Sequence, residues 1–105
     1  MTDEDLKDAY NRRVAQFPDD IRAAHNHSAD HRAEIIASTL CGCFYCRTTF
    51  KPAQITEWVD GRADGQGQTA LCPECGIDSV IGDKAGFDLT PQFLSTMHHH
   101  WFGTR

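Results

Sequence analysis

The first forty residues carry apolar side chains at the three- and four-residue spacing of amphipathic helices. The first stripe consists of Leu6, Tyr10, Val14 and Phe17, joined by Arg13. It predicts a helix that is capped by Thr2 and ends at Phe17. A second helix is predicted over residues 29–38, capped by Ser28, with Ile35 and Ile36 facing inward. Because isolated helices of this length are marginal in water, we expect both to pack on the rest of the chain.

Residues 39–82 follow a different pattern, in which short apolar runs alternate with turn-forming residues. Alternation over 55–59 predicts a strand, and 69–71 predicts its return partner. The intervening residues 60–67 are polar and rich in glycine, so we expect a β-hairpin with a surface loop at its tip. The apolar run at 77–81 is long enough to add a further strand.

The end of the chain has the pattern of a capped helix. Thr90 is the predicted cap, and Pro91 takes the first helical position, where its missing N–H is harmless. We expect this helix to run to about Phe102. One face carries Phe93, Leu94, Met97, His98, Trp101 and Phe102. Such an aromatic face is more typical of a core helix than of a binding groove.

Four of the five cysteines form two Cys-x2-Cys pairs, Cys43 with Cys46 and Cys72 with Cys75. Two thiolates three positions apart in a tight turn can point at one ion. A hairpin that brings two such turns together completes a tetrahedral site. Four sulfurs leave no open position for water or substrate, so we predict one structural ion per chain with no catalytic role.

Zinc is the favoured ion, and a rubredoxin-type iron is the minor alternative. Gly76 follows Cys75, as in both kinds of site, but Arg47 follows Cys46, and a bulky residue there is less expected beside an electron-transfer iron. The fifth thiol, Cys41, is interpreted as a small buried apolar residue rather than a competing ligand.

Nucleases with a ββα-metal core also carry two such cysteine pairs, but they need a histidine base between the pairs. Residues 47–71 contain no histidine. The six histidines lie at positions 25, 27, 31 and 98–100. We interpret them as surface and core residues, with a second metal site between the two groups as the alternative. The sequence therefore predicts a protein that is not an enzyme.

The net charge and the distribution of basic residues indicate which class of partner is favoured. The 105 residues include 15 acidic and 10 basic side chains, a net charge of −5, and the basic residues form no cluster. Nucleic-acid binders usually display a basic surface, so a protein partner is favoured over nucleic acid. The acidic start is unlike a secretory signal, and no stretch is apolar enough for a membrane span; we expect a cytoplasmic protein without membrane association.

The segments 38–46 and 70–83, which hold the two cysteine pairs, resemble a family of small, functionally uncharacterised bacterial cytoplasmic proteins with a four-cysteine site. The resemblance extends from about His31 to Phe102 and is weakest in the first forty residues. It implies a zinc-ribbon or treble-clef-like domain in the bacterial cytoplasm, and it implies no specific activity.

Together these patterns predict an α+β fold in a single domain over residues 1–105. Residues 1–38 would form an N-terminal helical extension, and residues 39–105 a zinc-binding hairpin followed by a C-terminal helix. Both sets of helices are expected to pack around the hairpin.

The favoured function is a non-enzymatic, zinc-stabilised binding or adaptor module. Phe44, Tyr45 and Arg47 at the tip of the first cysteine turn are the candidate contact residues, although Phe44 and Tyr45 could instead pack on the last helix. Alternatives are a nucleic-acid binder using Arg47, Lys51 and Arg62, a rubredoxin-like electron carrier, and an acidic immunity or antitoxin-type antagonist of a cationic protein.

Overall fold

The structure is a computed structural model that describes residues 2–61 and 65–103. Within these residues the helices are α1 (Asp3–Ala15), α2 (Asp19–His25), α3 (Arg32–Ala37) and α4 (Pro91–Phe102). The strands are β1 (Cys41–Cys43), β2 (Thr49–Phe50), β3 (Trp58–Val59), β4 (Thr69–Ala70) and β5 (Val80–Gly82). The predicted α+β class is confirmed. Arg62, one of the three basic residues considered for nucleic-acid binding, lies outside the described residues.

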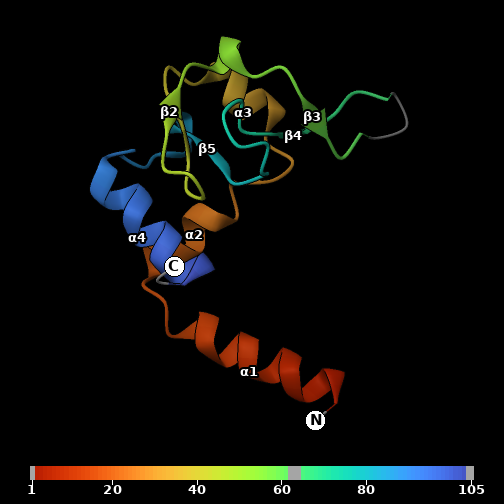
Figure 1. Ribbon diagram of the computed structural model, residues 1–105, viewed down its shortest axis with the longest axis vertical. Helices are drawn as coiled ribbons and strands as arrows, with labels where there is room; N and C mark the ends of the chain where they lie inside the picture. The colour runs from red at the N-terminus through yellow and green to blue at the C-terminus, as the bar shows by residue number, and fades with distance from the viewer. Residues whose placement is uncertain (1, 62–64, 104–105) are drawn as a thin grey trace.

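Two small antiparallel sheets lie at the end of the molecule opposite α1, with α2 and α4 between them and α1 (Figure 1). In the first sheet, β1 lies between β2 and β5, so that Cys41 faces both Phe50 and Gly82. The second sheet is the predicted hairpin of β3 and β4, in which Trp58 pairs with Ala70. The first strand of this hairpin is shorter than the alternation over 55–59 suggested.

The buried apolar side chains form two clusters, one on each side of β1 and β5. The first joins α2 to α4 and contains Phe17, Ile21, Ala24, Phe44, Ile81, Leu89, Leu94 and Met97. The second joins α3 to both sheets and contains Ile35, Cys41, Cys43, Phe50, Ile55, Ala70, Cys72 and Val80. The cysteine turns are thus built into the second cluster, and α4 covers the first, as its apolar face predicted.

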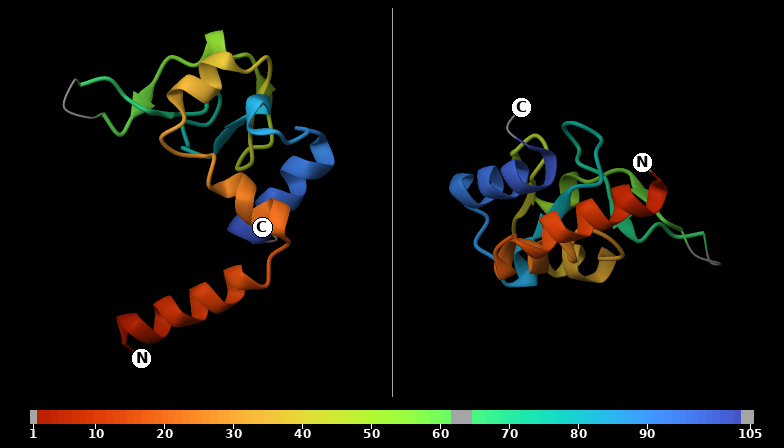
Figure 2. Two further views of the ribbon diagram at one scale, coloured as in Figure 1. Left: turned by 180° about the vertical axis from the view of Figure 1, so that it is seen from behind. Right: turned by 90° about the horizontal axis from the view of Figure 1, so that it is seen from below.

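The first helix does not pack as expected. Within the described part of the chain, no residue of α1 is buried; Leu6 is 55% exposed and Tyr10 is 47% exposed. Figure 1 and the left view of Figure 2 show α1 extending away from the sheets. The apolar periodicity predicted the stripe correctly but could not indicate which surface the stripe contacts. The first core cluster ends at Phe17, whose ring lies 5.0 Å from that of Trp101.

The helix predicted over residues 29–38 begins later than expected. Asp30 has a φ of 50°, a left-handed conformation that interrupts any helix, so α3 starts at Arg32. Ser28 does not cap it, because its hydroxyl donates to the carbonyl of His25. Ile35 is fully buried as predicted, but Ile36 is 62% exposed.

Candidate metal centre

The four paired cysteines converge at one point. Their sulfur atoms all lie within 4.8 Å of one another. Cys43 Sγ is 3.7 Å from Cys75 Sγ, and Cys46 Sγ is 3.7 Å from Cys72 Sγ. A disulfide would need ~2.05 Å, whereas a tetrahedral ion with metal–sulfur bonds of ~2.3 Å holds its sulfurs about 3.8 Å apart. The arrangement therefore fits four thiolates around one metal ion.

The two cysteine turns have the same backbone geometry. In the first, the N–H of Arg47 donates to the carbonyl of Cys43 at 2.7 Å; in the second, the N–H of Gly76 donates to that of Cys72 at 2.9 Å. Both residues after the second cysteine are left-handed, with φ of 66° at Arg47 and 78° at Gly76. Glycine adopts this conformation freely, whereas arginine adopts it at a steric cost.

The site closes the space between the two sheets. Cys43 ends β1, and Cys72 follows β4, so the two buried sulfurs come from different sheets. Cys46 and Cys75 are half-buried and lie toward the surface. Two of the four ligand side chains are therefore buried and two are partly exposed.

The pKa values of the two buried thiols, Cys43 and Cys72, shift in opposite directions. Burial raises the pKa of the Cys43 thiol well above its ordinary value. Burial also opposes ionisation of Cys72, but hydrogen bonds from the backbone N–H groups of Cys75 and Glu74 outweigh it, so the pKa of Cys72 is lowered. The N–H of Glu74 lies 3.4 Å from the sulfur of Cys72. A cation supplies the charge that four clustered thiolates require.

Cys41 does not join this site. It is fully buried in β1 between β2 and β5, and the cluster of four contains only the paired cysteines. Burial raises the pKa of Cys41 to about 12, so it stays a neutral thiol. Its interpretation as a small apolar core residue agrees with this placement.

The three candidate contact residues of the first turn separate into two groups. Phe44 is only 1% exposed; it packs in the first core cluster, with its ring 5.7 Å from that of Phe102. Phe44 is therefore corrected from a contact residue to a core residue, because α4 covers it. Tyr45 is 43% exposed and meets Phe102 edge-on at 5.0 Å, and Arg47 is exposed.

Histidines from the two ends of the chain pack on aromatic rings of the opposite end. His25 stacks on Trp101 at 3.8 Å, and His100 lies 4.9 Å from Phe17. Burial lowers the pKa of His25. Among residues 2–61 and 65–103, the four cysteines are the one group of three or more side chains placed to hold a metal ion. The described histidines therefore form no second site of this kind.

His31 has a structural role that the sequence did not reveal. It is 5% exposed, its Nδ1 donates to the carbonyl of His27 at 2.6 Å, and its Nε2 accepts the N–H of Ala70 at 3.1 Å. This neutral imidazole joins the start of α3 to β4, two residues before Cys72. Burial lowers the pKa of His31. Its partner Ala70 lies 39 positions away, so no local pattern could have indicated the contact.

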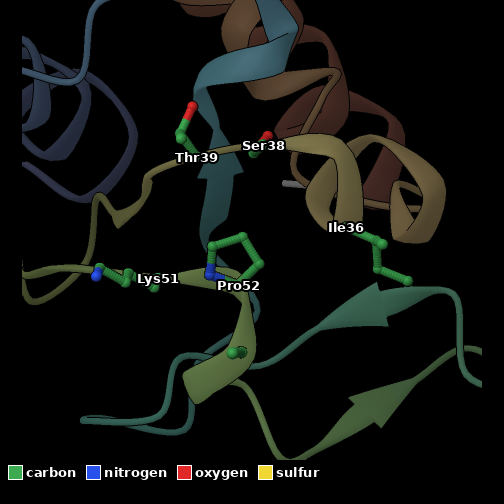
Figure 3. Close-up of a pocket in the computed structure, with 6 residues that line it drawn as sticks. Ile36, Ser38, Thr39, Lys51 and Pro52 are labelled. Carbon is green, nitrogen blue, oxygen red and sulfur yellow. The ribbon is translucent and has the colours of Figure 1, made fainter.

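A cleft of about 460 Å³ lies between the C-terminal end of α3 and the segment 51–53 (Figure 3). It is lined by Ile36, Ser38, Thr39, Lys51, Pro52 and Ala53. Figure 3 shows Ile36 and Pro52 on its walls. Lys51 is the single ionisable side chain among these six residues, and one amine provides no acid–base pair for catalysis.

The comparisons with known proteins place this chain in no family. No family model matches it, and neither a curated protein nor a solved structure is similar to it. The resemblance to small bacterial cytoplasmic proteins therefore stays a prediction. Among the described helices, none is both long enough and apolar enough to traverse a lipid bilayer.

Proposed function

We propose that this chain is a zinc-stabilised binding module without catalytic activity, and that its partner is a protein. The observation that carries the proposal is the four-sulfur cluster, with cross-turn sulfur distances of 3.7 Å. A closed tetrahedron of thiolates suits zinc, which imposes no geometry of its own and is structural when all four positions are filled by protein. Arg47 beside the site supports zinc over a rubredoxin-type iron.

The choice of metal is tested by quantifying the metal in protein purified without added ions. We expect one zinc per chain and a colourless solution, because zinc has a filled d shell. A red protein with one iron per chain would contradict the zinc assignment. Chelation of the ion should unfold the region around both sheets, since binding energy of about 10 kcal/mol or more is part of its folding energy.

The surface proposed for the partner lies at the first cysteine turn. Tyr45 and Phe102 form an exposed aromatic pair, with His98 6.0 Å from the Tyr45 ring. Arg47, two positions after Tyr45, is also exposed. Aromatic side chains and arginine are enriched where proteins bind one another. The metal holds Tyr45 in place because the turn on which it sits contains two ligands.

Affinity capture from the native host tests this surface. A Tyr45→Ser/Phe102→Ser variant should lose the captured protein while keeping its metal content. An Ile36→Ser variant is the matched control, because Ile36 is more exposed, at 62%, but lies on α3 away from the turn. If both variants captured the same amount of the protein, the proposed surface would be excluded as the binding site.

A further inference from the structure

Within the described residues, helix α1 contacts the first core cluster only near its C-terminal end, where Val14 packs against that cluster. It has thirteen residues, of which none is buried, and Leu6 and Tyr10 expose about half of their surface. A helix of this length is marginal in water without tertiary contacts. Capping by Thr2 adds some stability, but an apolar stripe that faces water adds none. A second surface that covers the apolar stripe would therefore stabilise α1.

The stripe has the spacing of a two-stranded coiled coil. Positions 3, 6, 10 and 13 are separated by steps of three, four and three, which is the a/d pattern of a heptad. These positions hold Asp3, Leu6, Tyr10 and Arg13, all within α1. The two central positions, Leu6 and Tyr10, are apolar. Asp3 precedes them and Arg13 follows them.

The charges at the flanks select an orientation. In a parallel pair, Asp3 would face Asp3 of the second copy, and Arg13 would face Arg13. In an antiparallel pair, a and d positions meet, so Asp3 faces Arg13 of the second copy at both ends, and Leu6 faces Tyr10 twice. The stripe is thus complementary to itself in the antiparallel orientation, as a two-fold symmetric interface requires.

The surface of α1 also has a matching depression. A hollow of about 280 Å³ is lined by Ala9, Tyr10 and Arg13, and the guanidinium of Arg13 lies 5.6 Å from the Tyr10 ring centre. In a coiled coil, a side chain of one helix inserts between four residues of the facing helix. Positions 6, 9, 10 and 13 form such a set, and the small side chain of Ala9 leaves the space open.

We propose that α1 binds α1 of a second copy of this chain in antiparallel orientation, with Leu6 of each copy seated in the hollow beside Tyr10 of the other. The N-terminal end of α1 is the end distant from the sheets (Figure 1), so this pairing holds the two cysteine-bearing bodies at opposite ends of an elongated dimer. Two thirteen-residue helices bury less area than a standard interface, so we expect a dissociation constant on the order of 10 µM. This inference does not depend on the proposed zinc or its partner.

The first test is sedimentation equilibrium of the metal-loaded chain from about 5 µM to about 500 µM. We expect a monomer–dimer equilibrium, and small-angle scattering should give an extended dimer. Leu6→Gln/Tyr10→Gln should weaken dimerisation at least tenfold, because glutamine keeps helix propensity but removes the apolar contacts. Ile36→Gln, on α3, should have no effect.

The second test exchanges the flanking charges. Asp3→Lys places two bases at each end of the pair, and Arg13→Glu places two acids there, so each variant alone should dimerise several-fold more weakly at low salt. An equimolar mixture restores opposite charges at both ends and should form a heterodimer. Far-UV circular dichroism checks that α1 remains helical in each variant.

Three results would overturn the proposal. A monomer at every concentration would show that the stripe serves another partner. If the dimer persists in Leu6→Gln/Tyr10→Gln, the interface lies outside α1. If the dimer is lost in Ile36→Gln, the interface lies at the cleft near α3. A compact dimer in scattering, or a charge-exchanged mixture that stays monomeric, would exclude the antiparallel pairing. Metal content is unaffected in every case and reports separately on the cysteine site.

Discussion

Replacing Arg47 by glycine should stabilise the protein. Arg47 has a φ of 66° and occupies the position that Gly76 fills in the second cysteine turn. A left-handed conformation costs a residue with a side chain ~1–2 kcal/mol. Glycine removes that cost but loses about 0.5–1 kcal/mol through the greater freedom of the unfolded chain. The Arg47 side chain is exposed, so its removal costs little, and the net gain should be about 0.5–1 kcal/mol.

Urea unfolding at a fixed free zinc concentration measures this gain, because metal binding would otherwise shift the apparent stability. The melting temperature should rise by about 2–8 °C. The reciprocal change, Gly76→Ala, should cost about 0.5–1 kcal/mol by the same balance. An added Cβ at Gly76 meets no atom within 4 Å, so conformation alone sets its effect. Destabilisation by Arg47→Gly would refute the reasoning and show that the Arg47 side chain contributes more than its strained backbone costs.

Three further substitutions test the rest of the fold. Cys43→Ser should abolish stoichiometric metal binding and remove about 10 kcal/mol of metal-linked stability, seen as loss of the unfolding transition of the region around both sheets. His31→Ala should cost about 1–3 kcal/mol by leaving the N–H of Ala70 unpaired. Because the pKa of His31 is lowered on folding, its contribution is complete above pH ~6.5 and declines as pH falls below that value; in His31→Ala this part of the pH dependence of the unfolding midpoint should disappear. Gly82→Ala should cost about 1–3 kcal/mol, because the new Cβ overlaps the side chain of Ser38.

Local signals predicted the cysteine cluster and α4 well. Cys-x2-Cys spacing is fixed by the turn that the pair itself forms, so the four sulfurs could be grouped without knowledge of the fold. The start of α4 is determined equally locally: Thr90 Oγ1 accepts the N–H of Phe93 at 3.1 Å, and Pro91 follows directly. In both cases the residues that determine the structure lie within a few positions of one another.

The remaining features depend on residues far apart in the sequence. Phe44 is buried because α4 covers it, and the turn alone gives no sign of that cover. Asp30 interrupts the predicted helix while its N–H donates to Thr69, 39 positions later. The apolar stripe of α1 was visible, but a periodic pattern cannot say whether a stripe faces the chain's own core or another molecule. These outcomes were decided by tertiary contacts, which override local preference.

The two sheets share no hydrogen-bonded ladder within the described residues, and the sulfurs of Cys43 and Cys72 lie between them. Amide exchange in β3 and β4 should therefore slow as the logarithm of free metal concentration rises, whereas exchange in α4 should follow the separate core around Leu94 and Met97. The concentration of available metal would then determine how often the β3–β4 hairpin separates from the rest of the chain while the core around α4 remains folded.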